Sequence, residues 1–438
     1  MSFKNNWKAA LGAGLVALAA AITLASCGGG SSSSTTTTTT TTPVNNTAAA
    51  EVNAGPAGNS LNMLFVTVTV CMPGSTTNCQ TINNVQVDTG SEGLRVLSSA
   101  LGSLDPSKGN GSGLPTVNDS SGDVLQECVQ FADTTYVWGP VATADVSIAG
   151  EKASSLPIHV ISANPLYPVP SSCLSLGNGG DINTLQTLEA NGIIGLGVFP
   201  NDCGGACTAS SASAPDQYFF CPGGVCSLPT SGVPLNDQVT QPVVGFASDN
   251  NGIMITMPGI SASGQASASG SVIFGIGTQS NNGLGSASVY SVDDTGSFTA
   301  TYNGVQYPSS AFLDTGSTAF YFLDHTTLGI PDCSDYSGLY CPASTQNYTI
   351  TNTALDGTTT TGQVTISIAN TDSLLGPAAG PYTGFTALND LGGDGGSSPS
   401  TDMVDYGMPF FYNRSVFVGI MGQSAPSNAT NTYGYFAF

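Results

Sequence analysis

The sequence predicts an all-β protein with a few short helices, folded as two lobes with a cleft between them. Short runs rich in Val, Ile, Phe, Tyr and Thr are separated by turn residues, as in Val66 to Val70 and Val364 to Ile368, and this alternation is typical of strands. The chain beyond residue 59 has about 380 residues, which is more than one typical hydrophobic core holds. One short helix is expected from Thr184 to Ala190, because Asn191 and Gly192 end the pattern.

The first 27 residues have the pattern of an export signal. Lys4 and Lys8 precede an apolar run from Ala9 to Leu24, which has the length of a signal-peptide core. The run closes with Leu24 to Cys27, which resembles the lipobox of bacterial lipoproteins and makes Cys27 the lipidated residue. An ordinary secretory signal with an incidental cysteine is the alternative. Because residue 28 is Gly and not Asp, the resemblance to lipoproteins of Gram-negative bacteria implies the outer membrane, on its periplasmic or its surface-exposed face.

Residues 28–59 are predicted to be a disordered linker. Three glycines, four serines and eight threonines follow one another from Gly28 to Thr42, and such a tract cannot bury apolar surface. A coil of this length reaches roughly 30 Å, enough to hold a domain away from a membrane. We assign residues 60–266 to an N-terminal lobe and residues 267–438 to a C-terminal lobe. Beyond the signal segment no apolar run is long enough to span a bilayer.

The charge of the chain disfavours several kinds of partner. After Cys27, 28 acidic residues stand against four basic ones, Arg95, Lys108, Lys152 and Arg414. Nucleic acid and anionic lipid surfaces repel such a protein, so the lipid anchor is the only membrane contact expected. Phosphate-binding and dinucleotide-binding motifs are absent from the sequence, and we expect neither a cofactor nor a metal. The protein is expected to be a monomer.

The cysteines fit an oxidising compartment. The sequence has eleven, and removing Cys27 leaves ten, an even number that fits disulfides. Cys71 with Cys79 and Cys333 with Cys341 are expected to close short loops. The pairing of the others stays open; they are Cys128, Cys173, Cys203, Cys207, Cys221 and Cys226. The last four of these crowd one segment and also allow a four-cysteine zinc site, although their spacing is loose for zinc and the exported context favours disulfides.

Two copies of the sequence Asp-Thr-Gly-Ser, one in each lobe, carry the candidate chemistry. The first begins at Asp88 after the alternating run Val85 to Val87, and the second begins at Asp314 after Ala311 to Leu313. Each pattern predicts a strand that ends in a tight turn, with the aspartate at the strand end. The residues of the two motifs are Asp88, Thr89, Gly90, Ser91, Asp314, Thr315, Gly316 and Ser317.

A third copy begins at Asp294 and shows that one match alone is weak. The charged residue Asp293 precedes it, and an alternating run from Phe298 follows it, so this copy predicts an exposed hairpin turn. The segment after the second copy, Thr318 to Phe322, is apolar enough to be buried. We therefore take Asp314 and not Asp294 as the site residue of the C-terminal lobe.

The two motifs and their surroundings resemble the pepsin-like aspartic proteases. In that family two apolar residues and a glycine pack beneath each aspartate turn. Ile193-Ile194-Gly195 and Tyr406-Gly407 match this element, with Asp405 where an apolar residue is expected. Gly270 to Gly277 is similar to the strand that opens the family's second lobe. The resemblance covers about residue 61 to residue 438 and implies a two-lobed β-barrel architecture around a cleft. The chain is also similar to an uncharacterised family of bacterial lipoproteins with an Asp-Thr-Gly-Ser signature.

The resemblance makes Asp88 and Asp314 the catalytic pair. Two carboxylates held about 3 Å apart cannot both ionise, so they share one proton and titrate as a unit. One then serves as general base toward a water and the other as acid toward the scissile carbonyl oxygen. In the family the motif threonines lock the two turns together, the serines bond the carboxylates, and the glycines let backbone approach closely. These supporting roles fall to Thr89, Thr315, Ser91, Ser317, Gly90 and Gly316.

The flap, the hairpin that covers the cleft in active members, departs from the family pattern. The corresponding stretch, Cys128 to Gly139, lacks the expected Tyr-Gly pair. Phe131 and Tyr136 are the candidates for the flap aromatic, and the alternative interpretation makes both ordinary strand residues. Arg95 stands where the family has an aromatic that supports the flap, with Glu92 or an acid of the flap as its expected partner.

Two functions follow from these patterns. The first is an aspartic endopeptidase, tethered to the cell envelope, that hydrolyses polypeptide held in the inter-lobe cleft. The second is a pepsin-like shell without turnover, used as a surface binding or adhesion lipoprotein, and the missing flap signature motivates it. A Ser-His-Asp triad is disfavoured, because the chain has only His159 and His325 and no motif places a nucleophilic serine. His159 lies in a strand-like run, and we expect it to be structural.

Overall fold

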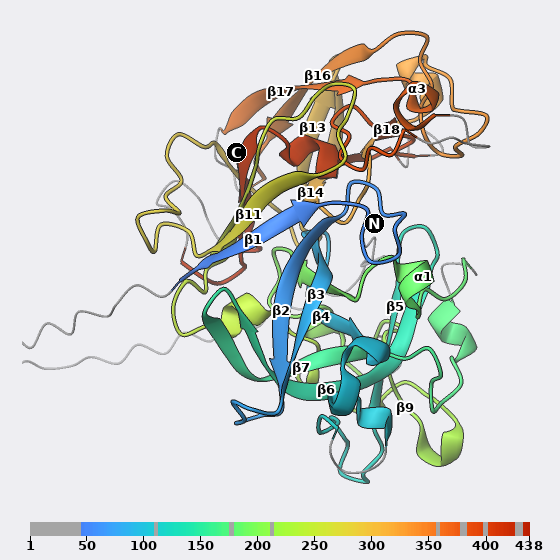
Figure 1. Ribbon diagram of the computed structural model, residues 1–438, viewed down its shortest axis with the longest axis vertical. Coiled ribbons are helices and arrows are strands. Elements are labelled where there is room, and N and C mark those ends of the chain that lie inside the picture. The colour runs from blue at the N-terminus through green and yellow to red at the C-terminus, as the bar shows by residue number, and fades with distance from the viewer. Residues whose placement is uncertain are drawn as a thin grey trace, which may run out of the picture.

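The fold is described from a computed structural model of the chain, in which residues 45–108, 113–174, 179–210, 214–355, 360–376, 383–396, 402–424 and 432–438 are described. These residues form two lobes (Figure 1). Strands dominate, and the helices are few and short, so the all-β prediction is confirmed. The predicted signal peptide, the lipidation site at Cys27 and the first part of the predicted linker lie outside the described residues.

The larger sheet has 14 strands and joins both halves of the chain. Its strands are β1 (Thr47–Val52), β2 (Leu64–Cys71), β3 (Cys79–Asp88), β4 (Glu92–Leu97), β5 (Leu125–Gln130), β6 (Tyr136–Ile148), β7 (Glu151–Ile161), β8 (Gly192–Leu196), β9 (Tyr218–Phe220), β10 (Gly252–Met257), β11 (Ala268–Phe274), β12 (Val289–Ser291), β20 (Arg414–Gly419) and β21 (Tyr435–Ala437). Their order is β12-β21-β20-β10-β11-β1-β2-β3-β8-β4-β7-β6-β5-β9. The predicted lobe boundary, between residues 266 and 267, falls between the hydrogen-bonded neighbours β10 and β11.

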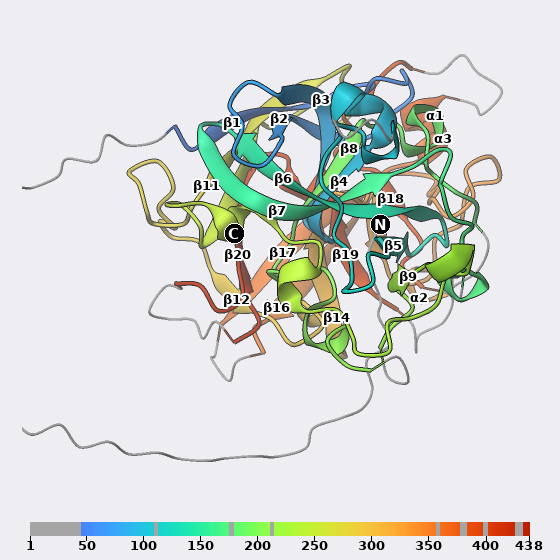
Figure 2. The ribbon, with the colours of Figure 1, turned by 90° about the horizontal axis from the view of Figure 1, so that it is seen from below.

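The smaller sheet has seven strands and belongs to the second half of the chain. Its strands are β13 (Phe298–Tyr302), β14 (Val305–Asp314), β15 (Phe320–Phe322), β16 (Gln346–Thr353), β17 (Thr361–Ile368), β18 (Gly392–Gly393) and β19 (Val404–Gly407). Their order is β17-β16-β13-β14-β19-β15-β18. In Figure 1 this sheet forms the upper lobe and β2 to β9 form the lower one, with the paired strands β1 and β11 between them. Figure 2 shows the long, curved strands β6 and β7 wrapping the lower lobe.

The helices are single turns held by their caps. The α-helices are α1 (Leu185–Leu188), α2 (His325–Leu328) and α3 (Thr371–Leu375). The helix expected from Thr184 to Ala190 is present as α1 but is shorter, and Thr184 caps it by accepting a hydrogen bond from the backbone N–H of Thr187. The 3-10 helices are Ser98–Ala100, Gly102–Leu104, Pro106–Lys108, Ser171–Leu174, Gly204–Ala206, Pro222–Gly224, Leu235–Asp237, Pro242–Gly245 and η9 (Met408–Phe411). Among the described residues, no helix has the length and apolar character needed to cross a membrane.

Strand β1 corrects the predicted extent of the linker. It lies inside the range 28–59 that the sequence predicted to be disordered, yet its six residues pair with β11, from Thr47 with Ile273 to Val52 with Ala268. The reason is a change in composition: Ala48, Ala50 and Val52 alternate toward the core, whereas the tract of identical small residues ends at Thr42. The folded part of the chain therefore begins more than ten residues earlier than predicted.

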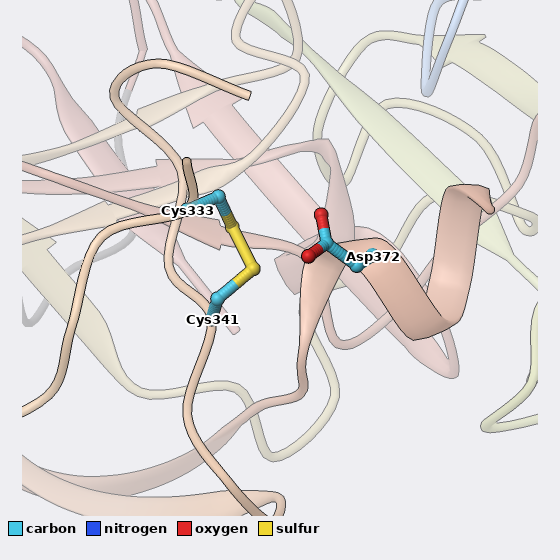
Figure 3. A group of neighbouring side chains, drawn as sticks. All are labelled: Cys333, Cys341 and Asp372. Atoms are coloured by element: carbon cyan, nitrogen blue, oxygen red, sulfur yellow. A yellow bond between two sulfur atoms is a disulfide. The ribbon is translucent and has the colours of Figure 1, made fainter. Parts of the chain in front are cut away.

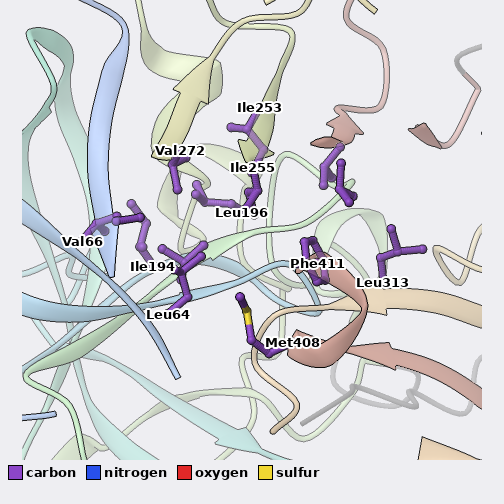
Figure 4. Packing of buried hydrophobic residues seen from close by; sticks show 14 of the residues in the cluster. Leu64, Val66, Ile194, Leu196, Ile253, Ile255, Val272, Leu313, Met408 and Phe411 are labelled. Atoms are coloured by element: carbon purple, nitrogen blue, oxygen red, sulfur yellow. The ribbon is translucent and has the colours of Figure 1, made fainter. Parts of the chain in front are cut away.

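The hydrophobic core is continuous across both sheets. Figure 4 shows side chains from β2, β8, β10, β11, β14 and η9 packed in one cluster. The labelled members are Leu64, Val66, Ile194, Leu196, Ile253, Ile255, Val272, Leu313, Met408 and Phe411. Full burial of one such aliphatic side chain contributes about 1.5–3 kcal/mol. The cluster thus connects the lobes directly behind the strands that end in Asp88 and Asp314.

Five disulfides are present among the described residues. The two predicted pairs are present, Cys71 with Cys79 and Cys333 with Cys341, and Figure 3 shows the second beside Asp372. The pairs that the sequence left open are Cys128–Cys173, Cys203–Cys207 and Cys221–Cys226. Because the four crowded cysteines are all oxidised, they offer no thiolate to a metal, and the alternative of a four-cysteine zinc site is wrong.

Candidate active site

Asp88 and Asp314 each end a strand inside a sheet. Asp88 is the last residue of β3 and lies opposite Gly195 of the parallel strand β8. Asp314 is the last residue of β14 and lies opposite Gly407 of the parallel strand β19. β4 then returns antiparallel to β8, and β15 returns antiparallel to β19. The two halves of the chain thus build the same local arrangement, and each predicted glycine element lies beside its aspartate strand.

Two threonines lock the aspartate turns to each other across the lobe interface. Thr89 Oγ1 donates to the carbonyl of Leu313 at 2.8 Å and accepts from the N–H of Thr315 at 3.0 Å. Thr315 Oγ1 donates to the carbonyl of Val87 at 2.8 Å and accepts from the N–H of Thr89 at 3.2 Å. Both side chains are buried, so no water competes for these bonds. The reciprocal bonds fix the relative position of the two aspartates.

The first turn binds its own carboxylate and makes room for the other. The N–H of Gly90 donates to Asp88 Oδ1 at 2.8 Å, and Ser91 Oγ donates to Asp88 Oδ2 at 2.5 Å. A Cβ on Gly90 would lie 2.6 Å from Cγ of Asp314, closer than carbon atoms pack. Glycine is therefore required at this position because the carboxyl group of the opposite lobe occupies the space.

The second turn repeats this geometry. The N–H of Gly316 donates to Asp314 Oδ1 at 2.7 Å, and Ser317 Oγ lies 2.9 Å from Asp314 Oδ2. A Cβ on Gly316 would lie 2.6 Å from Asp88 Oδ1. Each carboxyl group therefore rests against the glycine of the opposite turn, and all eight residues of the two predicted motifs meet in one place.

The two carboxyl groups are hydrogen-bonded to each other. Asp88 is 2% exposed and Asp314 is fully buried. Burial raises the pKa of Asp88 to about 7, and the nearby charge of Asp314 acts in the same direction. Below that pH the pair retains a proton that two separate aspartates would have lost. This is the arrangement that shared-proton carboxyl pairs need for acid and base chemistry.

The third copy of the motif lies away from this site. Asp294 and Thr295 are exposed, and the carboxylate of Asp293 accepts from the N–H and the hydroxyl of Thr295. The copy forms a turn, as predicted, but β12 and β13 on either side belong to different sheets. The predicted hairpin is therefore wrong, while the choice of Asp314 over Asp294 agrees with the geometry.

A third carboxyl group lies beside the pair. Asp405 is in β19 and is 2% exposed, and its Oδ2 is hydrogen-bonded to Ser317 Oγ at 2.7 Å. Burial, followed by the charge of Asp314, raises the pKa of Asp405 well above its ordinary value. The residue type was visible in the sequence as a departure from the family pattern. Its connection to Asp314 through Ser317 was not.

The β5–β6 hairpin occupies the place of the predicted flap. Phe131 follows β5, is buried, and packs in an apolar cluster with Phe65 and Leu97 of the first lobe. Tyr136 opens β6, is partly buried, and packs near Trp138. Neither cluster includes Asp88 or Asp314. Both flap candidates therefore pack within the first lobe, as the alternative interpretation of them expected.

The tip of the hairpin approaches the second lobe. Tyr321 is in β15, directly opposite Asp405 of β19. Burial raises the pKa of Tyr321, and the carboxylates of Asp405, Asp133 and Asp314 add to the rise. Asp133 belongs to the turn between β5 and β6. The charge of this turn thus acts on a tyrosine that lies opposite Asp405.

Arg95 is the centre of a buried charge network in the first lobe. It is 1% exposed, and its Nη2 lies 3.0 Å from Glu127 Oε1 and 2.8 Å from Asp202 Oδ2. Its Nη1 donates to the carbonyl of Glu92 at 2.6 Å. Glu127 lies in β5, one residue before the predicted flap stretch Cys128 to Gly139, so this partner of Arg95 is not an acid of that stretch. Glu92 contacts Arg95 through its backbone, and Asp202 was not predicted.

Two further side chains complete this network. His159 Nδ1 lies 3.1 Å from Glu127 Oε2, with both side chains fully buried. Tyr218 donates its hydroxyl to Asp202 Oδ1 at 2.6 Å. Although burial alone would raise it, the pKa of Glu127 is lowered to about 2 by Arg95, whereas burial lowers the pKa of His159 to about 4. His159 is therefore neutral at physiological pH, and its expected structural role agrees with its place in β7.

Glu92 is a buried carboxyl group next to the first motif, and the sequence pattern did not identify it as part of the site. It follows Ser91 directly, and its Oε1 accepts from the N–H of Phe199 at 3.3 Å. Burial raises its pKa to about 8, and the charge of Asp88 adds to the rise. Its position immediately after the first motif was the only signal available in the sequence.

Two clusters of potential metal ligands lie outside the aspartate site. His325 Nδ1 is 3.2 Å from Asp332 Oδ2 and 3.6 Å from Asp394 Oδ2. His325 is about half exposed, so this group lies at the surface. The other cluster combines Asp372 with Cys333 and Cys341, but a disulfide ties up both sulfurs (Figure 3).

Two hollows of about 370 Å³ each lie away from the aspartates. The first lies between β17, the segment Asn389 to Asp390 and the chain around Arg414. The second lies beside β1, β2 and the β6–β7 turn. Neither Asp88 nor Asp314 lines either of them. The two aspartates are themselves buried, so the pair is covered in this conformation.

The sequence from residue 42 to residue 438 matches a family described as "Protein of unknown function (DUF3443)". The chain belongs to this family. The match covers both lobes and begins just before β1, in agreement with the earlier start of the fold. No curated protein matches the sequence. Among solved structures, the chain is similar to an aspartic proteinase from Irpex lacteus, with 14% identity, a TM-score of 0.49, and coverage of 89% of this chain and 96% of that one.

Proposed function

We propose that the protein is an aspartic endopeptidase that hydrolyses peptide bonds through a shared-proton pair formed by Asp88 and Asp314. The observation that carries the proposal is the pair itself: two buried carboxyl groups, hydrogen-bonded to each other, on turns that Thr89 and Thr315 lock together. Such rigid positioning of acid and base is what general acid–base catalysis requires.

The proposed reaction needs only these two groups and a water. The ionised carboxylate takes a proton from the water, whose oxygen attacks the scissile carbonyl carbon. The protonated carboxyl group donates its proton to the carbonyl oxygen. The intermediate collapses when the carboxyl group that took the proton of the water passes it to the amide nitrogen, which leaves, while a hydroxyl of the intermediate returns its proton to the other carboxylate. The pair regains its single proton in the process. Because the pKa of Asp88 is about 7, the single-proton state extends to nearly neutral pH.

The remaining features of the proposal concern location and partner. The lipobox-like segment ending at Cys27 supports a lipoprotein anchored in the outer membrane. Its substrate is an extended polypeptide, bound between the lobes beneath the β5–β6 hairpin by a monomer. Substrate entry requires the segments that cover the pair to move, because both aspartates are buried in the present conformation.

The experiment uses the chain from Gly28 onward, which lacks the lipidated cysteine and retains β1. A peptide library is incubated with this chain between about pH 3 and pH 7, and products are identified by mass spectrometry. We expect cleavage that disappears in the double variant Asp88→Asn, Asp314→Asn and persists in the control Asp294→Asn. Cleavage that survives the double variant contradicts the assignment.

A binding function without turnover is the second candidate. The observation that favours it is the burial of the pair, with Asp88 2% and Asp314 0% exposed. A hairpin that does not open would leave the fold intact and the pair unused. This function predicts no cleavage at any pH by a chain that is folded and still binds extended peptide.

A further inference from the structure

Asp405 occupies a position that is apolar in the other half of the site. In the first lobe, Ile193 of β8 pairs with Arg95 of β4, two residues before Gly195. In the second lobe, Asp405 of β19 pairs with Tyr321 of β15, two residues before Gly407. Ile193 is part of an apolar cluster. The matching aspartate is thus not needed for the fold of this element, and it costs free energy to bury.

The hydroxyl of Ser317 cannot donate to both of its carboxyl neighbours. Its oxygen lies 2.9 Å from Asp314 Oδ2 and 2.7 Å from Asp405 Oδ2. A serine hydroxyl has one hydrogen and two lone pairs. One of the two short contacts must therefore be donated by a carboxyl O–H to Ser317. The site contains a proton that belongs to Asp314 or to Asp405.

The surroundings assign that proton to Asp405. Its Oδ1 is buried and has no hydrogen-bond partner, which is tolerable for a neutral carboxyl oxygen and costly for a carboxylate. The titratable groups that face it are Asp314 from β14, Asp88 from β3 and Tyr321 from β15. None of the ion pairs among the described residues involves Asp405. Asp314, in contrast, also accepts from the N–H of Gly316.

We infer that Asp405 is a protonated positioning residue of the aspartate pair. Its carboxyl O–H donates to Ser317 Oγ, and Ser317 then donates its only hydrogen to Asp314. This chain of hydrogen bonds stabilises negative charge on Asp314, so Asp314 is the base and Asp88 holds the shared proton as the acid. The raised pKa of Asp405 agrees with this assignment. The catalytic part of the inference rests on the proposed peptidase function, whereas the proton positions do not.

Loss of the Asp405 proton would dismantle this assignment. A carboxylate at that position would draw the Ser317 hydrogen to itself and place a second negative charge beside Asp314. Asp314 would then bind a proton more tightly and no longer act as the base. Asp405 therefore acts as a third carboxyl group that must stay neutral. Activity at alkaline pH then ends with the loss of either of two protons, the one shared by Asp88 and Asp314 or the one on Asp405.

The test uses two variants of the chain from Gly28 onward. Asp405→Asn keeps a donor toward Ser317 but cannot ionise, and Asp405→Val restores the apolar character found at Ile193. Asp294→Asn is the control, because that carboxylate is exposed and remote. The first readout is a titration of ¹³C-labelled aspartate carboxyl groups by NMR, and it needs no activity. The second is the pH dependence of kcat and of kcat/KM.

We expect the Asp405 carboxyl signal to remain that of the protonated form at about pH 7. In Asp405→Val the lower of the two titrations of the Asp88–Asp314 pair should move to higher pH, and in Asp405→Asn it should move less. In an active chain, kcat should fall about tenfold or more in Asp405→Val with little change in KM. In Asp405→Asn it should be largely retained, with a shallower fall of the rate at alkaline pH.

An ionised Asp405 at neutral pH, or a pair whose titrations are the same in all three proteins, overturns the inference. An identical pH profile in an active parent and in both variants also overturns it. A parent chain that cleaves nothing rejects the proposed peptidase instead, and the NMR titration still decides where the proton lies.

Discussion

The two lobes of this protein build the same strand-and-turn arrangement around an aspartate but handle buried charge in opposite ways. At equivalent positions the first lobe has Arg95 and Ile193, and the second has Tyr321 and Asp405. In the first lobe a buried cation is matched by acids. In the second lobe the buried acid Asp405 is hydrogen-bonded to Ser317 and belongs to none of the ion pairs among the described residues, and we propose that a proton takes the place of the cation.

This difference shows how a strongly acidic chain can bury carboxyl groups at all. Beyond Cys27 it has only four Lys and Arg residues. One of them, Arg95, is paired with Glu127 and Asp202. The other carboxyl groups near the site, Asp88, Glu92 and Asp405, have raised pKa values, and burial is the largest cause of each rise. The backbone repeat is therefore compatible with two electrostatic solutions: a buried cation paired with acids around Arg95, and a buried acid, Asp405, that belongs to none of the ion pairs among the described residues.

The largest effect is expected from breaking the ion network of the first lobe. Arg95→Met leaves Glu127 fully buried without its cation, so we expect the free energy of unfolding to fall by about 3–5 kcal/mol, measured by urea denaturation. The double variant Arg95→Met, Glu127→Gln should recover a large part of that loss, since no unpaired charge remains. A loss below about 1 kcal/mol for the single variant would show that the network is already neutral.

The threonine lock should be equally important on both sides. Thr89→Val and Thr315→Val each leave one carbonyl without its donor and one N–H without its acceptor in the buried interface. We expect each to lower the free energy of unfolding by about 2–4 kcal/mol. Thr295→Val, in the exposed third copy, should change it by less than about 0.5 kcal/mol. Unequal losses in the two lobes would mean that the lock is not symmetric.

The candidate site was predictable from sequence as far as local patterns reach. The two motifs, their strands and the choice of Asp314 over Asp294 depend on neighbouring residues, and the structure brings Asp88 and Asp314 together. The partners of Arg95 are far from it in the sequence: Glu127 is 32 residues away and Asp202 is 107 residues away. No periodicity or motif reports such contacts, and the same holds for the bond between Ser317 and Asp405.

The errors in the fold prediction have a common cause. The strand from Thr47 to Val52 was assigned to a linker because the tract before it is of low complexity, and its pairing with β11, which lies more than 200 residues later, is invisible locally. For Phe131 the sequence left a flap role and an ordinary strand role open, and burial against the first lobe's core favours the second. Tertiary contacts override local pattern in both cases.

The smallest expected effect is a shift of stability with pH. Asp88, Glu92, Asp202 and Asp405 have pKa values raised in the folded protein, so the folded state holds protons that the unfolded state has released. Their contribution is present below the unfolded pKa and is lost as pH rises through the folded values. His159, whose folded pKa is lowered to about 4, opposes this between about pH 6.5 and pH 4 with a single proton.

The carboxyl groups outnumber the histidine, so we expect the melting temperature of the parent chain to be higher at about pH 5 than at about pH 8. Asp405→Asn and Asp88→Asn should each reduce the difference, because each removes one such proton. Differential scanning calorimetry at the two pH values measures the difference in melting temperature. A melting temperature that falls steadily from about pH 8 to pH 5 would indicate that most buried carboxyl groups are stabilised in their charged form.

The most direct test of the central claim, a shared-proton pair built from Asp88 and Asp314, is the binding of pepstatin, which resembles the cleavage intermediate. Its affinity for the chain from Gly28 onward is measured by calorimetry at about pH 5, with the parent and the double variant Asp88→Asn, Asp314→Asn. We predict tight binding by the parent and an affinity at least about 100-fold weaker in the double variant. Equal affinities in a folded parent and a folded variant, or no binding by the parent, would contradict the claim.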